Sequence, residues 1–442
     1  MKLSSSVLFL PILGTAVLAF PNLGALPKSF ERAPKESWYE DLKRQVENHP
    51  KVRERLLVGS LTTPIDVTGD HAFVAPDFDN GDQRGPCPGL NALANHNYIP
   101  HNGVTSLIDT IVGVNTVFGM GIELITLLAT MGTVGVGDPL SLNPGFSIGG
   151  YTPEVSNLLD NVGGLLGTPR GLEGSHNWIE ADSSNTRDDL YVTGDASTMN
   201  MTLFLQIANG SDSEIITMED VGKRAADRLE VSIATNPYFY FGPYTGLIVR
   251  NAGYAFSGRL LSNHTIEHPD GIMTQGTMRS MYGVYSEDGT YVYKKGCEQI
   301  PPNWYRIPVD YGLVSLNVDL LTWIGKNPIL GSIGGNTGQV NTFTGVDLSN
   351  ITGGVLNAET LLEGNNLMCF ALEVVKTFAP NSLSPLFATL AVPLQLLNDA
   401  VNTSILDLTG CPDFADLSMG GVSFFEALQD TYPGAAKSGV AF

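Results

Sequence analysis

The longest apolar stretch of this chain after its N-terminus covers residues 104 to about 133 and is interrupted by Asp109 and Glu123. Its uncharged runs are shorter than the roughly 18 residues that a membrane span needs. The stretch therefore predicts one or two buried helices. Further helical patterns cover residues 36–57, with a break at Pro50, and residues 358–378 and 385–401. Together these patterns predict a mostly helical chain, with loops at many of its 49 glycines and 26 prolines.

The N-terminus carries an apolar run of a different kind. A lysine at position 2 is followed by apolar runs over residues 7–10 and 12–20, with Val17 and Ala19 at positions −3 and −1 of a cleavage point, which is the pattern of a secretory signal peptide. No later uncharged run is long enough to cross a membrane, so we expect export without an anchor. We expect a signal peptide over residues 1–19, an N-terminal arm or partly a propeptide over 20–69, and one domain over 70–442.

The charge balance agrees with an extracellular location. The chain has 45 acidic against 24 basic residues, a formal net charge of −21 and a sequence pI of about 4.6. Such a surface repels nucleic acid and anionic membranes, so neither is an expected partner. Five Asn-x-Ser/Thr triplets predict glycosylated surface loops in an exported chain, at Asn200, Asn209, Asn263, Asn350 and Asn402.

One cysteine stands between two prolines directly before a helical pattern. Leu90, Leu93 and Ala94 have helical spacing and predict a helix from residue 89 to about 97. Pro88 suits the first helical position, which places Cys87 at the N-cap, where unpaired N–H groups and the helix dipole favour a thiolate. A single thiolate fits haem iron, whereas iron–sulfur and structural zinc sites need several cysteines. An ordinary disulfide is the alternative for a secreted chain with four cysteines.

The sequence around this cysteine decides between the two. Residues 85–103 read GPCPGLNALANHNYIPHNG and resemble, almost residue for residue, the proximal segment of the fungal haem-thiolate peroxidases, the chloroperoxidase and unspecific peroxygenase family. The resemblance implies a mostly α, single-domain fold with few short strands and a C-terminal helical extension. It also implies a b-type haem bound through the Cys87 sulfur, and oxidation of a small organic substrate with hydrogen peroxide. A phenylalanine over the haem is implied too, with Phe118 as the candidate and core packing as its alternative.

An acidic segment further along resembles a metal site of the same family. The Glu-Gly-Asp-x-Ser-x-Thr-Arg pattern of the longer peroxygenases is present with Ala181 in place of the glycine. Carried over, the Glu180 carboxylate, the Ala181 carbonyl and the Ser184 hydroxyl would hold a magnesium ion against a haem propionate. The alternative is an acidic, serine-rich helix start without a metal.

The family's acid–base pair is missing from the matching positions. The strip RLEVSIATNPYFYFGPY, which begins at Arg228, resembles the segment that leads into the distal pocket. Longer peroxygenases place an arginine and a glutamate where this chain has Tyr244 and Asn251; Arg250 is one residue away. Because peroxide activation needs a group that moves a proton, the alternative function is a secreted haem-binding protein with impaired peroxygenase activity.

The remaining cysteines lie towards the C-terminus. Cys369 and Cys411 are separated like the disulfide pair near the end of longer family members, so the resemblance implies that they are joined. Cys297 is then the odd one out, and it is either buried or links two molecules. We therefore expect a monomer or a Cys297-linked dimer.

Overall fold

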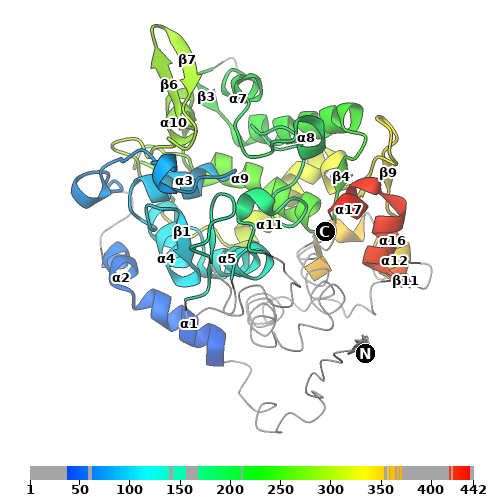
Figure 1. Ribbon diagram of the computed structural model, residues 1–442, viewed down its shortest axis with the longest axis horizontal. Helices are drawn as coiled ribbons and strands as arrows, with labels where there is room; N and C mark the ends of the chain where they lie inside the picture. The colour runs from blue at the N-terminus through cyan, green and yellow to red at the C-terminus, as the bar shows by residue number, and fades with distance from the viewer. Residues whose placement is uncertain are drawn as a thin grey trace, which may run out of the picture.

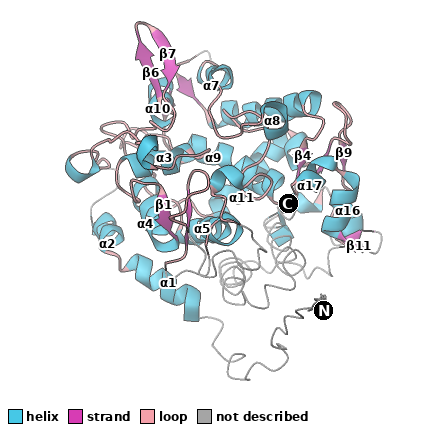
Figure 2. Ribbon diagram, in the orientation of Figure 1, coloured by secondary structure: helices cyan, strands magenta, loops and turns pink. Residues whose placement is uncertain are grey.

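The computed structural model is mostly helical with a few short strands in small sheets, as the sequence predicted (Figure 2). The described residues are 37–57, 62–138, 143–155, 168–210, 213–352, 356–357, 359–363, 366–367, 369–370, 418–419 and 422–438. The predicted signal peptide and most of the predicted C-terminal helices, 358–378 and 385–401, lie outside the described residues. The division into arm and domain stays a prediction.

Helices supply most of the described architecture (Figure 1). The α-helices are α1 (Ser37–Glu47), α2 (Pro50–Leu57), α3 (Pro88–Asn95), α4 (Leu107–Phe118), α5 (Ile122–Val136), α6 (Leu190–Thr193), α7 (Met201–Ala208), α8 (Met218–Thr235), α9 (Asn251–Arg259), α10 (Gln275–Met281), α11 (Leu313–Lys326), α12 (Leu348–Ile351), α16 (Phe424–Thr431) and α17 (Pro433–Lys437). The short 3₁₀ turns are η3 (Gly69–His71), η4 (Phe78–Asn80), η5 (Leu172–Gly174), η7 (Pro328–Gly331) and η8 (Thr360–Leu362), and η6 (Thr245–Arg250) is a π-helix.

All strand pairs are antiparallel and short. They are β1 (Val104–Ser106) with β2 (Gly145–Ser147), β3 (Ile215–Ile216) with β5 (Met273–Thr274), β4 (Tyr240–Phe241) with β8 (Gly334–Gly335) and β9 (Thr344–Gly345), β6 (Val284–Glu287) with β7 (Thr290–Tyr293), and β10 (Ser418–Met419) with β11 (Val422–Ser423). The β6–β7 hairpin projects away from the helices in Figure 1.

The long apolar stretch forms two buried helices, one of the two outcomes the sequence predicted. Ser106 caps α4, since its hydroxyl accepts a hydrogen bond from the Asp109 backbone N–H. Gly119, with a φ of 70°, ends α4 in the left-handed conformation that glycine adopts most easily. The chain then turns into α5, which packs against α4. In the described part of the chain, no helix has the length and hydropathy needed to cross a membrane.

Helix α8 supports α9, the helix that packs against it. A capping box begins it: the Thr217 hydroxyl accepts from the Asp220 backbone N–H, and the Asp220 carboxylate accepts from the Thr217 backbone N–H. One face of α8 packs against α9, and α9 in turn packs against α11. Pro50 stands at the first position of α2, which explains the predicted break between α1 and α2.

Candidate active site

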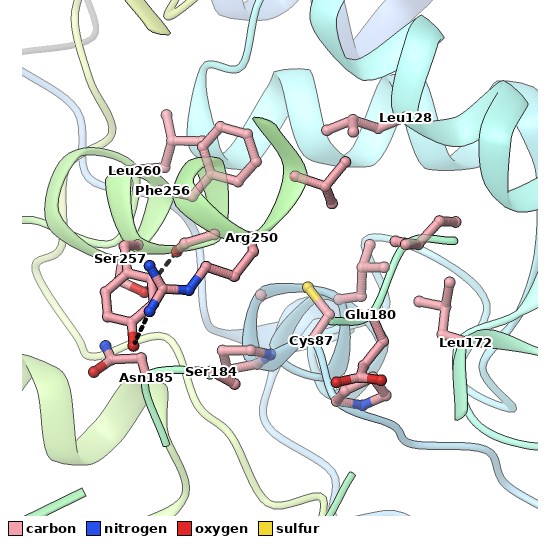
Figure 3. A pocket seen from close by; sticks show the side chains of 18 of the residues that line it. Cys87, Leu128, Leu172, Glu180, Ser184, Asn185, Arg250, Phe256, Ser257 and Leu260 are labelled. Carbon is pink, nitrogen blue, oxygen red and sulfur yellow. Dashed lines mark hydrogen bonds between the residues drawn. The ribbon is translucent and has the colours of Figure 1, made fainter. Parts of the chain in front are cut away.

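A cavity of about 290 Å³ lies between the start of α3 and α9 (Figure 3). Its walls are largely apolar and come from α4, α5, η5 and α9. The apolar lining residues include Val114, Phe118, Ile125, Leu128, Ala129, Phe146, Leu172, Val249, Phe256 and Leu260. One edge is polar and comes from a single segment, with Glu180, Ala181, Ser184, Asn185, Thr186 and Arg187. The cavity is thus apolar on its faces and polar along one edge.

Cys87 occupies the predicted N-cap of α3. Its backbone is extended, with φ −88° and ψ 107°, and Pro88 takes the first helical position. Its sulfur is free and points into the cavity (Figure 3), so no disulfide competes for it. The backbone N–H groups of Gly89 and Leu90 lie close enough to the sulfur to lower its pKa, although the Cys87 side chain makes no capping hydrogen bond. The first turn of the helix therefore presents one thiol to the cavity, as the sequence predicted.

The electrostatics of this thiol differ from the sequence-based expectation. Burial raises the pKa of Cys87, and the two backbone N–H donors and the Arg187 charge oppose that rise without cancelling it. The helix start alone therefore does not produce a thiolate here. A metal cation bound to this sulfur would deprotonate the thiol outright.

Residues around the start of α3 hold the cysteine in place. The Asn91 side chain accepts from the Gly85 backbone N–H at 3.0 Å and donates to the Gly85 carbonyl at 2.9 Å. Further along α3, the Asn95 amide donates to the carbonyls of Gly296 and Glu298 at 2.7 and 2.8 Å. These buried side chains fix the loop before Cys87 and the segment after β7 against the same helix.

Glu180, Ala181 and Ser184 all lie at the polar edge of the cavity. The Glu180 carboxylate is bound on one side by His176 Nδ1, at 2.6 Å from Oε2, while Oε1 is buried without a hydrogen-bond partner among the described residues. Ala181 is not among the residues with positive φ, so its backbone does not require glycine. The described residues contain no group of three or more His, Cys, Asp or Glu side chains arranged for a metal.

The acidic segment is anchored to α8 by a buried polar network. Asp182 accepts from the Asn236 amide at 2.8 Å, and Asp189 accepts from the Arg228 guanidinium at 3.2 Å and the Ser232 hydroxyl at 3.1 Å. Burial and the Asp189 charge raise the pKa of Asp182 well above its usual value. Burial would lower the pKa of His176, but the Glu180 and Asp182 carboxylates outweigh it and raise that pKa to about 9.

Of the three distal candidates, only Arg250 lines the cavity. Asn251 is buried, and its amide donates to the carbonyls of Leu247 and Leu330, both at 3.0 Å. Tyr244 is buried too and lines a separate small space beside α5. The structure therefore brings neither residue of the aligned pair to the cavity.

All three nitrogens of the Arg250 guanidinium donate hydrogen bonds to oxygen atoms of the protein. Its Nε donates to the Ser183 carbonyl at 3.0 Å, Nη1 to Asn251 Oδ1 at 2.9 Å and Nη2 to the Ala225 carbonyl at 2.7 Å. Burial lowers the pKa of Arg250 to about 10. Arg250 thus ties α9 to Ser183, a residue with a φ of 66°, rather than offering donors to a ligand.

A π-helix directly precedes α9, next to the cavity. Between residues 245 and 250 the backbone forms i→i+5 hydrogen bonds, such as Val249 N–H to the Tyr244 carbonyl at 3.0 Å. A π-bulge inserts one residue into a helix and rotates the later residues about the helix axis. Val249, Gly253 and Phe256 line the cavity, and a Cβ at Gly253 would have no heavy atom within 4 Å.

Polar groups on this wall are hydroxyls that the sequence did not indicate. Ser257 and Tyr282 both line the cavity, and their hydroxyl oxygens lie 2.7 Å apart. Ser257 Oγ also donates to the Gly253 carbonyl at 3.0 Å, so the Tyr282 hydroxyl donates to Ser257. Burial raises the pKa of Tyr282, which keeps its hydroxyl protonated. No motif marks either residue, because Ser257 in α9 and Tyr282 at the end of α10 are 25 positions apart in the sequence.

Phe118 lines the cavity, but on the Cys87 side. A Cβ at Gly89 would lie 3.4 Å from the Phe118 ring, and the ring packs edge-on against Trp304 with 5.8 Å between centroids. On the opposite wall, the phenylalanine is Phe256 from α9 (Figure 3). Phe256 was not among the residues that the sequence singled out.

Comparison with known proteins decides the family. A family described as "Peroxidase, family 2" matches residues 71–309, more than half of the chain. The chain belongs to this family, the fungal haem-thiolate peroxidases. The peroxidase is therefore an oxidoreductase that acts with hydrogen peroxide on organic substrates, and its family implies a haem.

Three relatives cover different shares of this peroxidase. The aromatic peroxidase fscJ of Fusarium equiseti is 57% identical over 383 residues, which is 86% of this chain and 87% of that protein. The dothistromin biosynthesis peroxidase dotB of Dothistroma septosporum is 36% identical over 431 residues, 97% of this chain and 99% of that one. An aromatic peroxygenase of Coprinellus radians is 32% identical over 226 residues, 48% of this chain and 84% of that protein.

The cavity of the peroxidase fits a haem in its chemistry. A haem is a flat apolar ring with an iron at its centre and two carboxylates on one edge. Apolar walls, one free thiol and one polar edge are the matching features here. Glu180 Oε1 and two nitrogens of Arg187 are buried at that edge without hydrogen-bond partners among the described residues, as expected of groups that bind a charged ligand.

The other predicted sites that the structure describes do not line the cavity. Asn209 is exposed, whereas the Asn200 and Asn263 amides donate to Asp188 and to the Asn303 carbonyl. The Asn350 side chain and Asn402 lie outside the described residues. Cys297 is a free, half-buried thiol. Cys369 is buried and Cys411 lies outside the described residues, so their pairing stays a prediction.

Proposed function

We propose that this peroxidase is a secreted haem-thiolate enzyme that oxidises a small, apolar, aromatic molecule with hydrogen peroxide. A b-type haem held between Cys87 and α9 would supply a redox-active iron that passes an oxidising equivalent from peroxide to the substrate. The observation that carries the proposal is the free thiol at the start of α3, which faces a largely apolar cavity. Secretion rests on the N-terminal pattern of residues 1–19.

Cys87 would bind the iron, and the surrounding residues would set its properties. Pro86 and Pro88 restrict the backbone on both sides of the sulfur. The N–H groups of Gly89 and Leu90 stabilise negative charge on the sulfur and thereby oppose the effect of burial on the pKa. The apolar walls exclude water from the sulfur, which strengthens these interactions.

Glu180, the Ala181 carbonyl and Ser184 would hold a magnesium ion at the polar edge. Oxygen ligands suit this hard cation, and one Glu180 oxygen has no other partner among the described residues. His176 bonds the second oxygen and so orients the carboxylate. A cation there would neutralise a carboxylate of the haem.

The wall opposite Cys87 indicates the substrate class. Leu128, Val249, Phe256 and Leu260 make this wall apolar, and the missing side chain at Gly253 leaves open space within it. A flat, apolar molecule fits such a wall better than a charged one. The names of two relatives, aromatic peroxidase and aromatic peroxygenase, favour an aromatic substrate as well.

A second candidate function is a secreted haem protein with slow peroxide turnover. It is favoured by the absence of carboxylates and imidazoles among the cavity-lining residues of η6 and α9 that the structure describes, where the titratable or hydroxyl-bearing residues are Arg250, Tyr254 and Ser257. Ser257 Oγ and the Tyr282 hydroxyl are then the groups that hold a proton on this wall, and both are weak acids and bases.

On oligomeric state, a half-buried Cys297 supports a monomer over a Cys297-linked dimer.

The absorption spectrum of the reduced carbon monoxide complex tests the proposal. Wild type should show the red-shifted Soret band of a thiolate-bound haem, and Cys87→Ala should lose it. Cys297→Ser is the matched control, because Cys297 is the other free thiol in the described chain, and it should keep the band. Survival of the band in Cys87→Ala, or its loss in Cys297→Ser, would overturn the assignment.

A further inference from the structure

Arg187 is a buried arginine with unused hydrogen-bond donors at the polar edge of the cavity. It lines the cavity and is 2% exposed. Its Nη1 donates to the Thr186 hydroxyl at 2.6 Å, but Nε and Nη2 have no hydrogen-bond partner in the described part of the chain. Buried charged donors without partners are strongly unfavourable, so such a group in a native fold requires an explanation.

Arg250, the other arginine at this cavity, shows what a purely structural arginine looks like here. Its three guanidinium nitrogens all donate to protein oxygens. Arg187 lies in the same cavity and is equally buried, but only one of its nitrogens is used. This contrast indicates that the two unused nitrogens of Arg187 bind a ligand.

The neighbouring acid Glu298 does not accept a hydrogen bond from the Arg187 guanidinium either. Glu298 Oε1 lies 3.8 Å from Arg187 Nη2, too far for a hydrogen bond, and neither Glu298 oxygen has a hydrogen-bond partner among the described residues. Burial raises the pKa of Glu298, which favours its neutral form. The Asn95 amide donates to the Glu298 backbone carbonyl at 2.8 Å and so fixes the backbone of this acid. The Arg187 charge thus remains available to an anion.

We infer that Arg187 binds a propionate carboxylate of the haem through Nε and Nη2. Adjacent nitrogens of a guanidinium match the two oxygens of a carboxylate, which gives a paired, charge-assisted contact. Arg187 belongs to the same segment as Glu180 and Ser184, so one stretch of chain would offer a metal-bridged and a direct carboxylate contact. This inference rests on the proposed function, because it requires a haem in the cavity.

The test compares protohaem with protohaem dimethyl ester, in which both carboxylates are blocked. Holoproteins carrying either cofactor are mixed with an excess of a haem-scavenging apoprotein, and first-order cofactor loss is followed by absorbance. Arg187→Met should speed loss of protohaem by about 10- to 100-fold, as expected for removing hydrogen bonds to a charged group. It should leave the loss of the dimethyl ester unchanged within about twofold.

Two further variants make the result specific. Arg187→Lys keeps the charge but loses the paired donors, so its effect on protohaem should be intermediate. Arg224→Met removes a buried arginine that does not line the cavity, and it should change the loss of both cofactors alike. If Arg187→Met does not fold, the rates at which Arg187→Lys loses protohaem and protohaem dimethyl ester provide the same test.

An equal effect of the Arg187 variants on protohaem and its dimethyl ester would overturn the inference, since the contact would then not involve a carboxylate. Failure of wild type to bind either cofactor would instead overturn the proposed function. The two failures are therefore distinguishable in one set of measurements.

Discussion

Two glutamate substitutions on neighbouring positions of α9 should have opposite effects. Asn251→Glu removes an amide that donates to the Leu247 and Leu330 carbonyls at 3.0 Å, inside a site that is 1% exposed. A buried carbonyl that loses its donor destabilises the fold by about 1–3 kcal/mol. The new carboxylate lies beside Arg250, which offsets part of the penalty for a buried charge. We expect Asn251→Glu to lower the free energy of unfolding by about 2–4 kcal/mol and to leave peroxide reactivity unimproved.

Gly253→Glu should be tolerated and should add a proton-transfer group. A Cβ at Gly253 would meet no heavy atom within 4 Å, and replacing a helical glycine removes a helix-propensity penalty of about 1 kcal/mol. The apolar wall would raise the pKa of the new carboxyl group towards neutrality, which suits acid–base chemistry. A positioned acid–base group typically contributes about 10²- to 10⁴-fold, so we expect a substantial part of that range.

Stopped-flow mixing of the holoprotein with hydrogen peroxide measures the rate, and chemical denaturation measures the free energy of unfolding. Gly253→Gln has nearly the same shape as Gly253→Glu but cannot transfer a proton, so it should not accelerate the reaction. Acceleration by Asn251→Glu without acceleration by Gly253→Glu would show that the helix face assigned to the cavity is wrong. Equal acceleration by Gly253→Gln would show that the added group does not act as an acid or base.

Three further predictions concern the polar edge and the cysteines. Elemental analysis of washed protein should find about one magnesium per haem, and Glu180→Gln should lose it; a magnesium-free wild type would leave that segment as a helix start. In metal-free protein the pKa of His176 is raised from 6.5 to about 9, so protonated His176 should add about 3 kcal/mol to the free energy of unfolding. This stabilisation should be fully present below pH 6.5 and disappear as the pH rises through 9. Denaturation at a series of pH values should show the loss, and His176→Gln should make the free energy of unfolding less dependent on pH across this range. Mass mapping without reduction should find Cys369 joined to Cys411 and Cys87 unpaired, whereas any peptide containing Cys87 in a disulfide would contradict the haem assignment as well.

Features encoded by neighbouring residues were predictable from the sequence. The N-cap position of Cys87 follows from Pro88 and the helical spacing after it, and the structure has the same arrangement. The placement of Glu180 and Ser184 at one cavity edge followed from a short motif, because the side chains lie on one turn of chain. In both cases the local backbone alone fixes which side chains come together.

Features that depend on helix register or on distant segments were not predictable. A π-helix directly precedes α9, and Asn251, seven positions after Tyr244, donates to the Leu330 carbonyl instead of lining the cavity. The approach of Glu298 to Arg187 joins segments that are far apart in the sequence. Spacing rules assume regular helices and near neighbours, and neither condition holds at these two places.

Three energetically unfavourable groups line the cavity, and one ligand could satisfy all of them. Burial raises the pKa of the Cys87 thiol, Arg187 has unused donors and one Glu180 oxygen has no partner among the described residues. A group that carries a metal cation at its centre and carboxylates at its edge would relieve all three at once: Cys87 would bind the cation as a thiolate, Arg187 would bind a carboxylate, and Glu180 would hold a magnesium ion. Because such a group binds the folded chain and not the unfolded one, each of these contacts also stabilises the fold. The protein should therefore unfold more easily without its haem than with it, and the difference should shrink when any of the three residues is replaced.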